Sequence, residues 1–162
     1  MKLMEDVFIH DAVEIDTTPE KIFAFLKNLK DDKSYCAWHP QDHLSMKWLE
    51  GEPWQEGSIV YAEEYLNKEL HKLKFQVVKY ADNKEIVYVP TSRFLRRYVP
   101  KLSFIVEKKE TKSIFKASMH YRSPLLLRVF AKKHLQAGLD AVRKHMKEEG
   151  ENIKKILEKE SI

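Results

Sequence analysis

The last forty residues constrain the fold most, because they predict one long amphipathic helix from Ser123 to Ile162. Apolar residues recur there four and three positions apart by turns, which places them in a single stripe along an α-helix. The stripe consists of Leu135, Leu139, Val142, Met146, Ile153 and Ile156. This stretch therefore predicts a helix with one face directed at the protein core.

A carboxylate interrupts that stripe. The core-facing position between Met146 and Ile153 is Glu149, and His145 stands four residues before it. Side chains at i and i+4 project together from a helix, and this pair has a metal-ligand spacing. The helix alone favours an ion pair at the edge of a buried face, because such pairs are common. A metal interpretation depends on what other segments bring to the same place.

Length and charge indicate one ordinary globular domain, residues 1–162. The chain has 162 residues, 43% of them hydrophobic, and no Pro/Gly/Ser-rich linker divides it. The net charge is +4 with lysines and glutamates interspersed, which permits an anionic partner without indicating one. A small patch with Arg93, Arg96, Arg97 and Tyr98 suits a solvated loop at a cavity rim, and no basic stripe indicates a nucleic-acid partner.

The sequence pattern does not suggest a membrane span or a signal peptide. No apolar run reaches the roughly 18 residues of a membrane span. The N-terminus carries acids inside its apolar part and no small-residue cleavage site, so it does not resemble a signal peptide. Cys36 is the single cysteine, which suits a small filler in a reducing cytoplasm better than a disulfide partner or a nucleophile.

The remaining chain alternates in the manner of β-strands, with two short helices after the first strand. The strands are expected at residues 7–15, 44–48, 58–66, 69–80, 85–90, 102–107 and 113–122. Thr18 and Pro19 suit the start of a first helix that ends near Asn28, and a second is expected at 31–37. Residues 91–100 form a less regular, basic segment.

The last strand shows how the sheet is covered. Phe115, Ala117, Met119 and Tyr121 alternate with polar residues and so share one apolar face. An antiparallel sheet with helices on one face is an α+β architecture, and the long helix is the expected cover.

The hairpin between residues 58 and 80 distinguishes two neighbouring glutamates. With Asn67-Lys68 as a two-residue turn, Glu64 opposes His71 and Glu63 opposes Lys72. His71 lies on the apolar side of its strand, so Glu64 is expected to point inward. A register slip of one residue would reverse this assignment. Glu64 is then either a buried carboxylate neutralised by His71 or part of a site.

The order of elements and the helix start TTPEKIFAFLKN resemble the START-like (SRPBCC, Bet v 1-like) superfamily. The resemblance covers nearly the whole chain and implies the helix-grip fold. In that fold a curved antiparallel sheet wraps around a long C-terminal helix, two short helices follow the first strand, and a hydrophobic cavity lies between sheet and helix. Carriers, receptors, cyclases and hydrolases share the fold, so it does not define the function.

One branch of that superfamily is more informative. The sequence WHPQDH from Trp38 to His43, a glutamate in the strand at 61–66, and His145 with Glu149 resemble the zinc site of diacetylphloroglucinol-hydrolase-like members. Those proteins cleave a carbon–carbon bond next to a ketone on an aromatic substrate. The resemblance implies Zn²⁺ at His39 or His43, Glu64, His145 and Glu149, and iron or manganese would accept the same ligands. This chain is much shorter than those members.

The two histidines of WHPQDH are expected to have different roles. His39 follows the short helix directly and is the favoured ligand. His43 shares the parity of Ser45 and Lys47, the outer face, which makes it a substrate contact, a ligand-orienting group or an alternative ligand. Asp42 is placed to orient either ring by accepting its free N–H.

Together these residues predict a metal-dependent hydrolase acting on a small apolar or aromatic carbonyl compound, with Glu64 or Glu149 moving the proton. The alternative is a non-catalytic carrier or sensor of a hydrophobic molecule. Nothing in the sequence supports a third class, a co-chaperone-like or toxin-type interaction module. The expected protein is a monomer or homodimer. The candidate cavity-lining residues are Trp38, Trp54, His71, Phe75, Tyr88, Phe104, Met119 and Tyr121.

Overall fold

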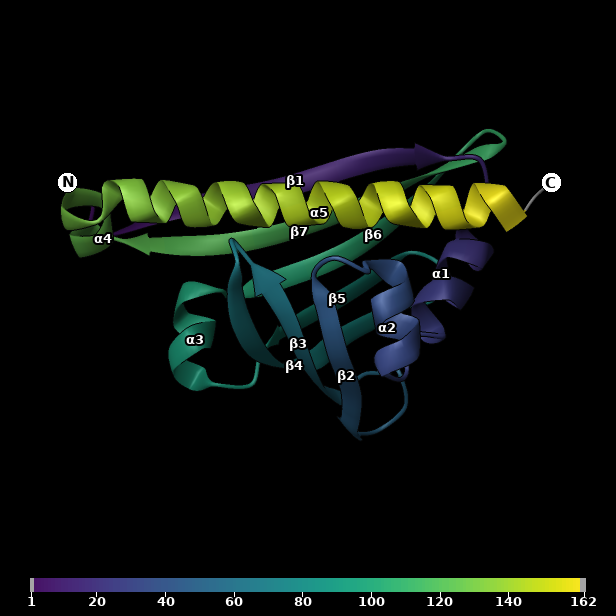
Figure 1. The fold of residues 1–162 in the computed structure, drawn as a ribbon, viewed down its shortest axis with the longest axis horizontal. Helices are drawn as coiled ribbons and strands as arrows, with labels where there is room; N and C mark the ends of the chain where they lie inside the picture. The colour runs from purple at the N-terminus through teal and green to yellow at the C-terminus, as the bar shows by residue number, and fades with distance from the viewer. Residues whose placement is uncertain (1, 161–162) are drawn as a thin grey trace.

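The computed structural model describes residues 2–160 and has the expected helix-grip fold, a curved antiparallel sheet with a long helix across it (Figure 1). The seven strands lie in the order β1-β7-β6-β5-β4-β3-β2. The strands are β1 (Met4–Ile15), β2 (His43–Glu50), β3 (Ile59–Leu66), β4 (Glu69–Ala81), β5 (Glu85–Pro90), β6 (Lys101–Lys109) and β7 (Lys112–Pro124). The helices are α1 (Pro19–Lys27), α2 (Asp32–Trp38), α3 (Arg93–Tyr98), α4 (Leu125–Phe130) and α5 (Lys132–Glu160).

The two short helices start where their capping residues predict. Thr18 Oγ1 accepts a hydrogen bond from the Lys21 amide at 3.3 Å, with Pro19 at the first helical position. Asp31 and Ser34 form a reciprocal capping box at the start of α2. These caps fix where α1 and α2 begin in the segment between β1 and β2.

The hairpin of β3 and β4 has the predicted register. Glu64 opposes His71 and Leu66 opposes Glu69. Asn67 and Lys68 form the turn with φ values of 52° and 64°, the left-handed conformation that a two-residue hairpin turn requires. Glu64 is therefore on the inner face, as expected, and only 8% of its surface is exposed.

The core lies between the inner face of the sheet and α1, α2 and α5. Phe115 and Ala117 of β7 are buried in it, as their alternation predicts. From α5, Met146, Ile153 and Leu157 are buried against the sheet, chiefly along β1 (Figure 1). The apolar stripe of the helix is thus its packing face.

Two segments differ from the sequence expectations. The C-terminal stretch is not one helix, because Ala131 leaves the helical region (φ −131°, ψ 34°) and separates α4 from α5; residues 161–162 of the expected helix lie outside the described residues. The segment 91–100 contains the helix α3, which starts where Ser92 Oγ accepts a hydrogen bond from the Leu95 amide at 3.3 Å. Periodicity alone could not detect a helix of six residues.

Within residues 2–160, no helix combines the length and the apolar character needed to cross a membrane.

Gly150 allows α5 to approach β1 closely. A Cβ atom at this position would lie 3.2 Å from Val13 Cγ1, whereas at Gly138 it would meet no atom within 4 Å. We expect Gly150→Leu to lower the free energy of unfolding by about 1–3 kcal/mol through overpacking. The matched variant Gly138→Leu should raise it by up to about 1 kcal/mol, because leucine favours a helix over glycine. Urea unfolding measures both, and a stable Gly150→Leu would contradict this packing.

Candidate metal centre

Four buried side chains from three elements converge between the sheet and α5. His43 starts β2, Glu64 lies in β3, and His145 and Glu149 are one turn apart in α5. His43 Nε2 lies 3.2 Å from Glu149 Oε2 and 3.7 Å from Glu64 Oε2. His145 Nε2 lies 3.2 Å from Glu149 Oε1 and 3.6 Å from Glu64 Oε2. Each imidazole thus faces both carboxylates.

A β-bulge directs His43 inward. His43 opposes Glu64 and Ser45 opposes Glu63, so the register shifts between them and Leu44 is the extra residue. The parity that placed His43 on the outer face together with Ser45 therefore does not apply. His43 is buried, with 3% of its surface exposed. Alternation along a strand cannot reveal a bulge, because the extra residue inverts the pattern at one point only.

His39 occupies a neighbouring position with different contacts. Its Nδ1 accepts a hydrogen bond from the Asp42 amide at 3.0 Å, and its Nε2 lies 2.8 Å from Glu148 Oε2. Ligand atoms of His39, Asp42 and His145 lie within 4.8 Å of one another. Both ring nitrogens of His39 are nevertheless engaged, so the geometry favours His43, not His39, as the partner of Glu64 and Glu149. Glu148, which lies three residues after His145, is not among the residues predicted from the sequence.

The hydrogen bonds of the two facing histidines determine their tautomers. His43 Nδ1 lies 2.9 Å from the carbonyl oxygen of Tyr35, which can only accept, so Nδ1 carries the hydrogen. His145 Nδ1 lies 3.4 Å from Asp42 Oδ2, which accepts in the same way. In the neutral rings, both Nε2 lone pairs therefore point toward Glu64 and Glu149. The Asp42 carboxylate thus orients His145 of α5 rather than His39 or His43, the two rings that the sequence suggested for it.

Tyr35 is a further residue of the site that the sequence analysis missed. Its hydroxyl donates a hydrogen bond to Glu64 Oε2. Its ring stacks on His43 with the centroids 3.7 Å apart and the planes at 4°. Burial and then the charge of Glu64 raise its pKa well above the ordinary value, so the hydroxyl keeps its proton. A buried tyrosine usually has a hydrogen-bond partner. A tyrosine in the short helix α2 could for that reason have been considered as a contact of the site.

The charges of the site stabilise one another. Burial alone would lower the pKa of His145, but the carboxylates of Glu149 and Glu64 outweigh it and raise that pKa to about 10. Burial opposes ionisation of Glu64, yet His145, His43 and the Tyr35 hydroxyl lower its pKa to about 2. The metal-free protein therefore holds cationic imidazole against anionic carboxylate inside the core.

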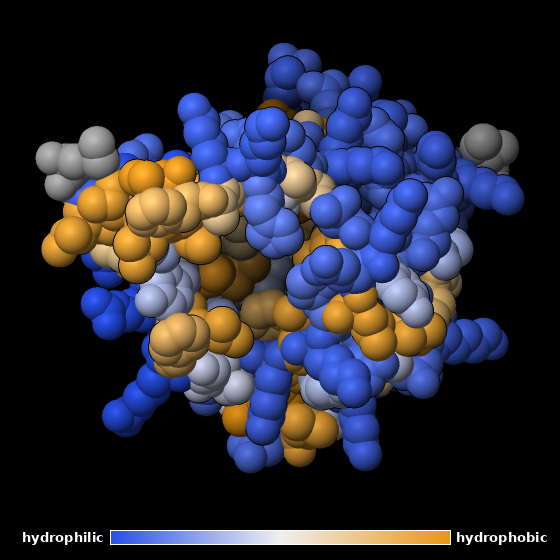
Figure 2. Space-filling model, turned by 60° about the vertical axis from the view of Figure 1, so that its left-hand side comes forward, coloured by the Kyte–Doolittle hydropathy of each residue, from blue (hydrophilic) through white to orange (hydrophobic). Residues whose placement is uncertain are grey.

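A cavity of about 410 Å³ lies against this cluster, and Glu64, His145 and Glu149 form one wall of it. Seven of the eight predicted cavity residues line it: Trp38, Trp54, His71, Phe75, Tyr88, Phe104 and Met119. Tyr121 does not, because it lies further along β7, opposite Val7. Figure 2 shows a hollow with an apolar floor at the end of the molecule where α3 and α4 lie.

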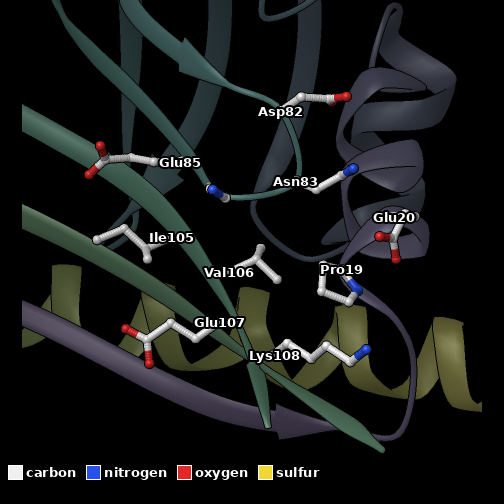
Figure 3. Close-up of a pocket in the computed structure, with 10 residues that line it drawn as sticks. Pro19, Glu20, Asp82, Asn83, Glu85, Ile105, Val106, Glu107 and Lys108 are labelled. Carbon is white, nitrogen blue, oxygen red and sulfur yellow. The ribbon is translucent and has the colours of Figure 1, made fainter. Parts of the chain in front are cut away.

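A second depression, of about 710 Å³, lies where the start of α1 meets the turn between β4 and β5. It is more open to solvent than the cavity, and no histidine or cysteine lines it. Figure 3 shows the carboxylates of Glu20, Glu85 and Glu107 pointing apart instead of toward a common point. The convergent polar groups expected of a binding site are found in the cavity and not in this depression.

Proteins of known structure share the fold of this chain, but none of the matches bears on the metal site. No family model and no curated protein matches the sequence. Many solved structures match the fold. One is the KanY protein (ms6282), which is 15% identical with a TM-score of 0.72, covering 95% of this chain and 99% of the other.

Two further structures are similar over most of their length. The polyketide-cyclase-like protein Cgl2372 from Corynebacterium glutamicum is 16% identical with a TM-score of 0.60, covering 96% of this chain and 94% of the other. Norcoclaurine synthase from Thalictrum flavum is 15% identical with a TM-score of 0.56, covering 88% and 87%. At these identities the likeness establishes the fold, and activity must be argued from the site.

The ionised cluster makes stability depend on pH. The folded pKa of His145, about 10, exceeds its ordinary value of 6.5, so its contribution is complete below pH 6.5 and is lost as pH rises toward 10. In metal-free protein held in chelator, we expect the free energy of unfolding to fall across that range. His145→Asn should be less stable at neutral pH but should lack this fall. Urea unfolding between pH 6 and 10 measures the difference, and parallel curves for both proteins would contradict it.

Proposed function

We propose that this protein binds a small hydrophobic carbonyl compound in the cavity and hydrolyses it with a divalent metal held by His43, Glu64, His145 and Glu149. The proposal rests mainly on the surroundings of the His43 Nε2 atom. It is buried, has no hydrogen-bond partner, and lies 3.2 and 3.7 Å from two carboxylate oxygens. A buried polar atom without a partner is costly, and a cation between the four groups would satisfy it.

The four groups fit a metal by chemistry and by spacing. Imidazole nitrogen and carboxylate oxygen are ligands for Zn²⁺, Fe²⁺ and Mn²⁺. With ligand bonds of about 2.0–2.1 Å, the corners of a tetrahedral site lie about 3.4 Å apart. The four nitrogen-to-oxygen distances of the cluster are 3.2, 3.2, 3.6 and 3.7 Å. Both histidines also have the outer hydrogen bond that commonly orients a metal-binding ring.

The surrounding residues suit hydrolysis. If a metal held by these groups expanded its coordination or released one carboxylate, it would lower the pKa of a bound water and polarise a carbonyl. Tyr35 holds Glu64 in place by its hydrogen bond, and Glu149 would accept and return the proton. Water would add to the ketone carbon, the bond from that carbon to the aromatic ring would break, and the ring carbon would take up the proton. This is the reaction of the hydrolases that the WHPQDH loop and the His145–Glu149 pair resemble.

The cavity supports a small, mostly apolar substrate. Its volume of about 410 Å³ lies at the lower end of the range for ligand sites, and aromatic side chains form much of its lining. Tyr88 lines it, and burial together with Glu149 and Glu64 raises the pKa of its hydroxyl well above the ordinary value. A hydroxyl that stays protonated can donate a hydrogen bond to a substrate carbonyl. That norcoclaurine synthase has the same fold supports an enzyme without indicating this reaction.

Metal binding tests the ligand set. We expect the purified protein to bind about one divalent ion, and His43→Ala and His145→Ala to weaken binding at least tenfold by removing a ligand. His71→Ala is the matched control, because His71 lines the cavity outside the cluster. His39→Gln distinguishes the two histidines of the loop and should keep most of the affinity. Calorimetric titration with Zn²⁺ and Mn²⁺ measures all four, and undiminished binding by His43→Ala would contradict the assignment.

Turnover separates an enzyme from a carrier. With acylated phenols such as diacetylphloroglucinol, we expect hydrolysis that Glu149→Gln reduces by a hundredfold or more, as typical of losing an acid–base group. Tyr88→Phe should reduce it less. Product formation is followed by chromatography. If metal and an aromatic ligand bind but no ketone or ester is hydrolysed, the protein is a carrier or sensor of hydrophobic molecules and the hydrolase proposal fails.

A further inference from the structure

Large apolar side chains are exposed at one end of the molecule. Phe130 is 83% exposed, Leu126 70% and Phe94 68%. We call the exposed apolar set on α3, α4 and the nearby N-terminal residues the apolar end; it consists of Leu3, Phe94, Leu95, Leu126, Leu127, Val129 and Phe130. Figure 2 shows apolar side chains gathered beside the hollow. A patch of this kind marks an interaction site.

The apolar end adjoins the cavity. Leu95 belongs to it and also lines the cavity, together with Val99 at the end of α3. Helices α3 and α4 both contact β7, and the Leu125 amide donates a hydrogen bond to the Leu3 carbonyl at 2.9 Å. A partner that covers the apolar end would therefore lie next to the cavity.

The same end is basic. Residues 86–106 and 111–139 contain no aspartate or glutamate. Acids from β1 pair with two of the cations there, Glu5 with Arg128 and Asp6 with Arg122. Five exposed cations near this end form no salt bridge with another described residue: Arg93, Arg97, Lys101, Lys132 and Lys133. The apolar end is thus flanked by unpaired positive charge.

We propose that the apolar end docks on the surface of an anionic lipid bilayer, so that the cavity opens toward the membrane. Aromatic and aliphatic side chains enter the boundary between headgroups and acyl chains, while flanking lysines and arginines contact anionic headgroups. A second copy of this chain fits the surface poorly, because a symmetric contact would bring the five cations against five cations. A hydrophobic ligand dissolved in the bilayer would reach the cavity without crossing water.

Vesicle sedimentation tests the proposal on the full chain. We expect binding to phosphatidylcholine vesicles that contain phosphatidylglycerol, weaker binding to phosphatidylcholine alone, and release at high salt. The double variant Phe94→Ser/Phe130→Ser should reduce binding by about tenfold or more. Phe8→Ser is the matched control, because Phe8 is 67% exposed but lies on β1. Arg93→Gln/Arg97→Gln/Lys132→Gln/Lys133→Gln should remove the preference for phosphatidylglycerol, whereas Lys155→Gln/Lys159→Gln should not.

Several results would overturn the proposal. One is that the protein stays in the supernatant with both kinds of vesicle. Another is that Phe8→Ser loses as much binding as the double variant while thermal unfolding shows all variants folded. Concentration-dependent dimers that Phe94→Ser/Phe130→Ser abolishes, without vesicle binding, would identify the surface as a contact between copies. His43→Ala should bind vesicles like the original protein, so failure of the metal site and failure of docking are distinguishable.

Discussion

The structure depends on ionic contacts across the core between α5 and strands β2 and β3. Two imidazoles and two carboxylates are buried there, each imidazole within 4 Å of both carboxylates. A single buried charge would be strongly unfavourable, whereas opposite charges with outer hydrogen bonds can be accommodated. Asp42 and Tyr35 supply those outer contacts. Each group of the cluster therefore lowers the cost of burying the others.

Much of the fold could be predicted because its signals are local. Alternation located the strands, Thr18 and Pro19 located the start of the first helix, and the Asn67-Lys68 turn determined which glutamate points inward. A hairpin turn with its side-chain period of two leaves only one register consistent with an apolar inner face. The apolar stripe of the C-terminal helix likewise indicated that Glu149 is buried.

What could not be predicted depends on a single residue or on contacts between distant segments. The bulge at Leu44 inverts the parity of one residue, and so the sequence favoured His39 where the structure favours His43. Tyr35 reaches Glu64 only because α2 packs against β2, the strand next to β3. No local sequence pattern encodes that contact. Ala131 interrupts a helical pattern with no proline or glycine to signal the break. Each of these features lies where tertiary structure overrides a local rule.

The order of the strands gives the four-residue cluster a mechanical role. The helix α5 packs chiefly along β1, at one edge of the sheet, whereas β2 and β3 lie at the opposite edge. Between these edges the sheet curves around the cavity, so apolar packing of α5 secures only one side. On the other side, the contacts of His43 and Glu64 with His145 and Glu149 connect β2 and β3 to α5. The groups suited to chemistry are thus also those that hold the cavity closed along its second edge.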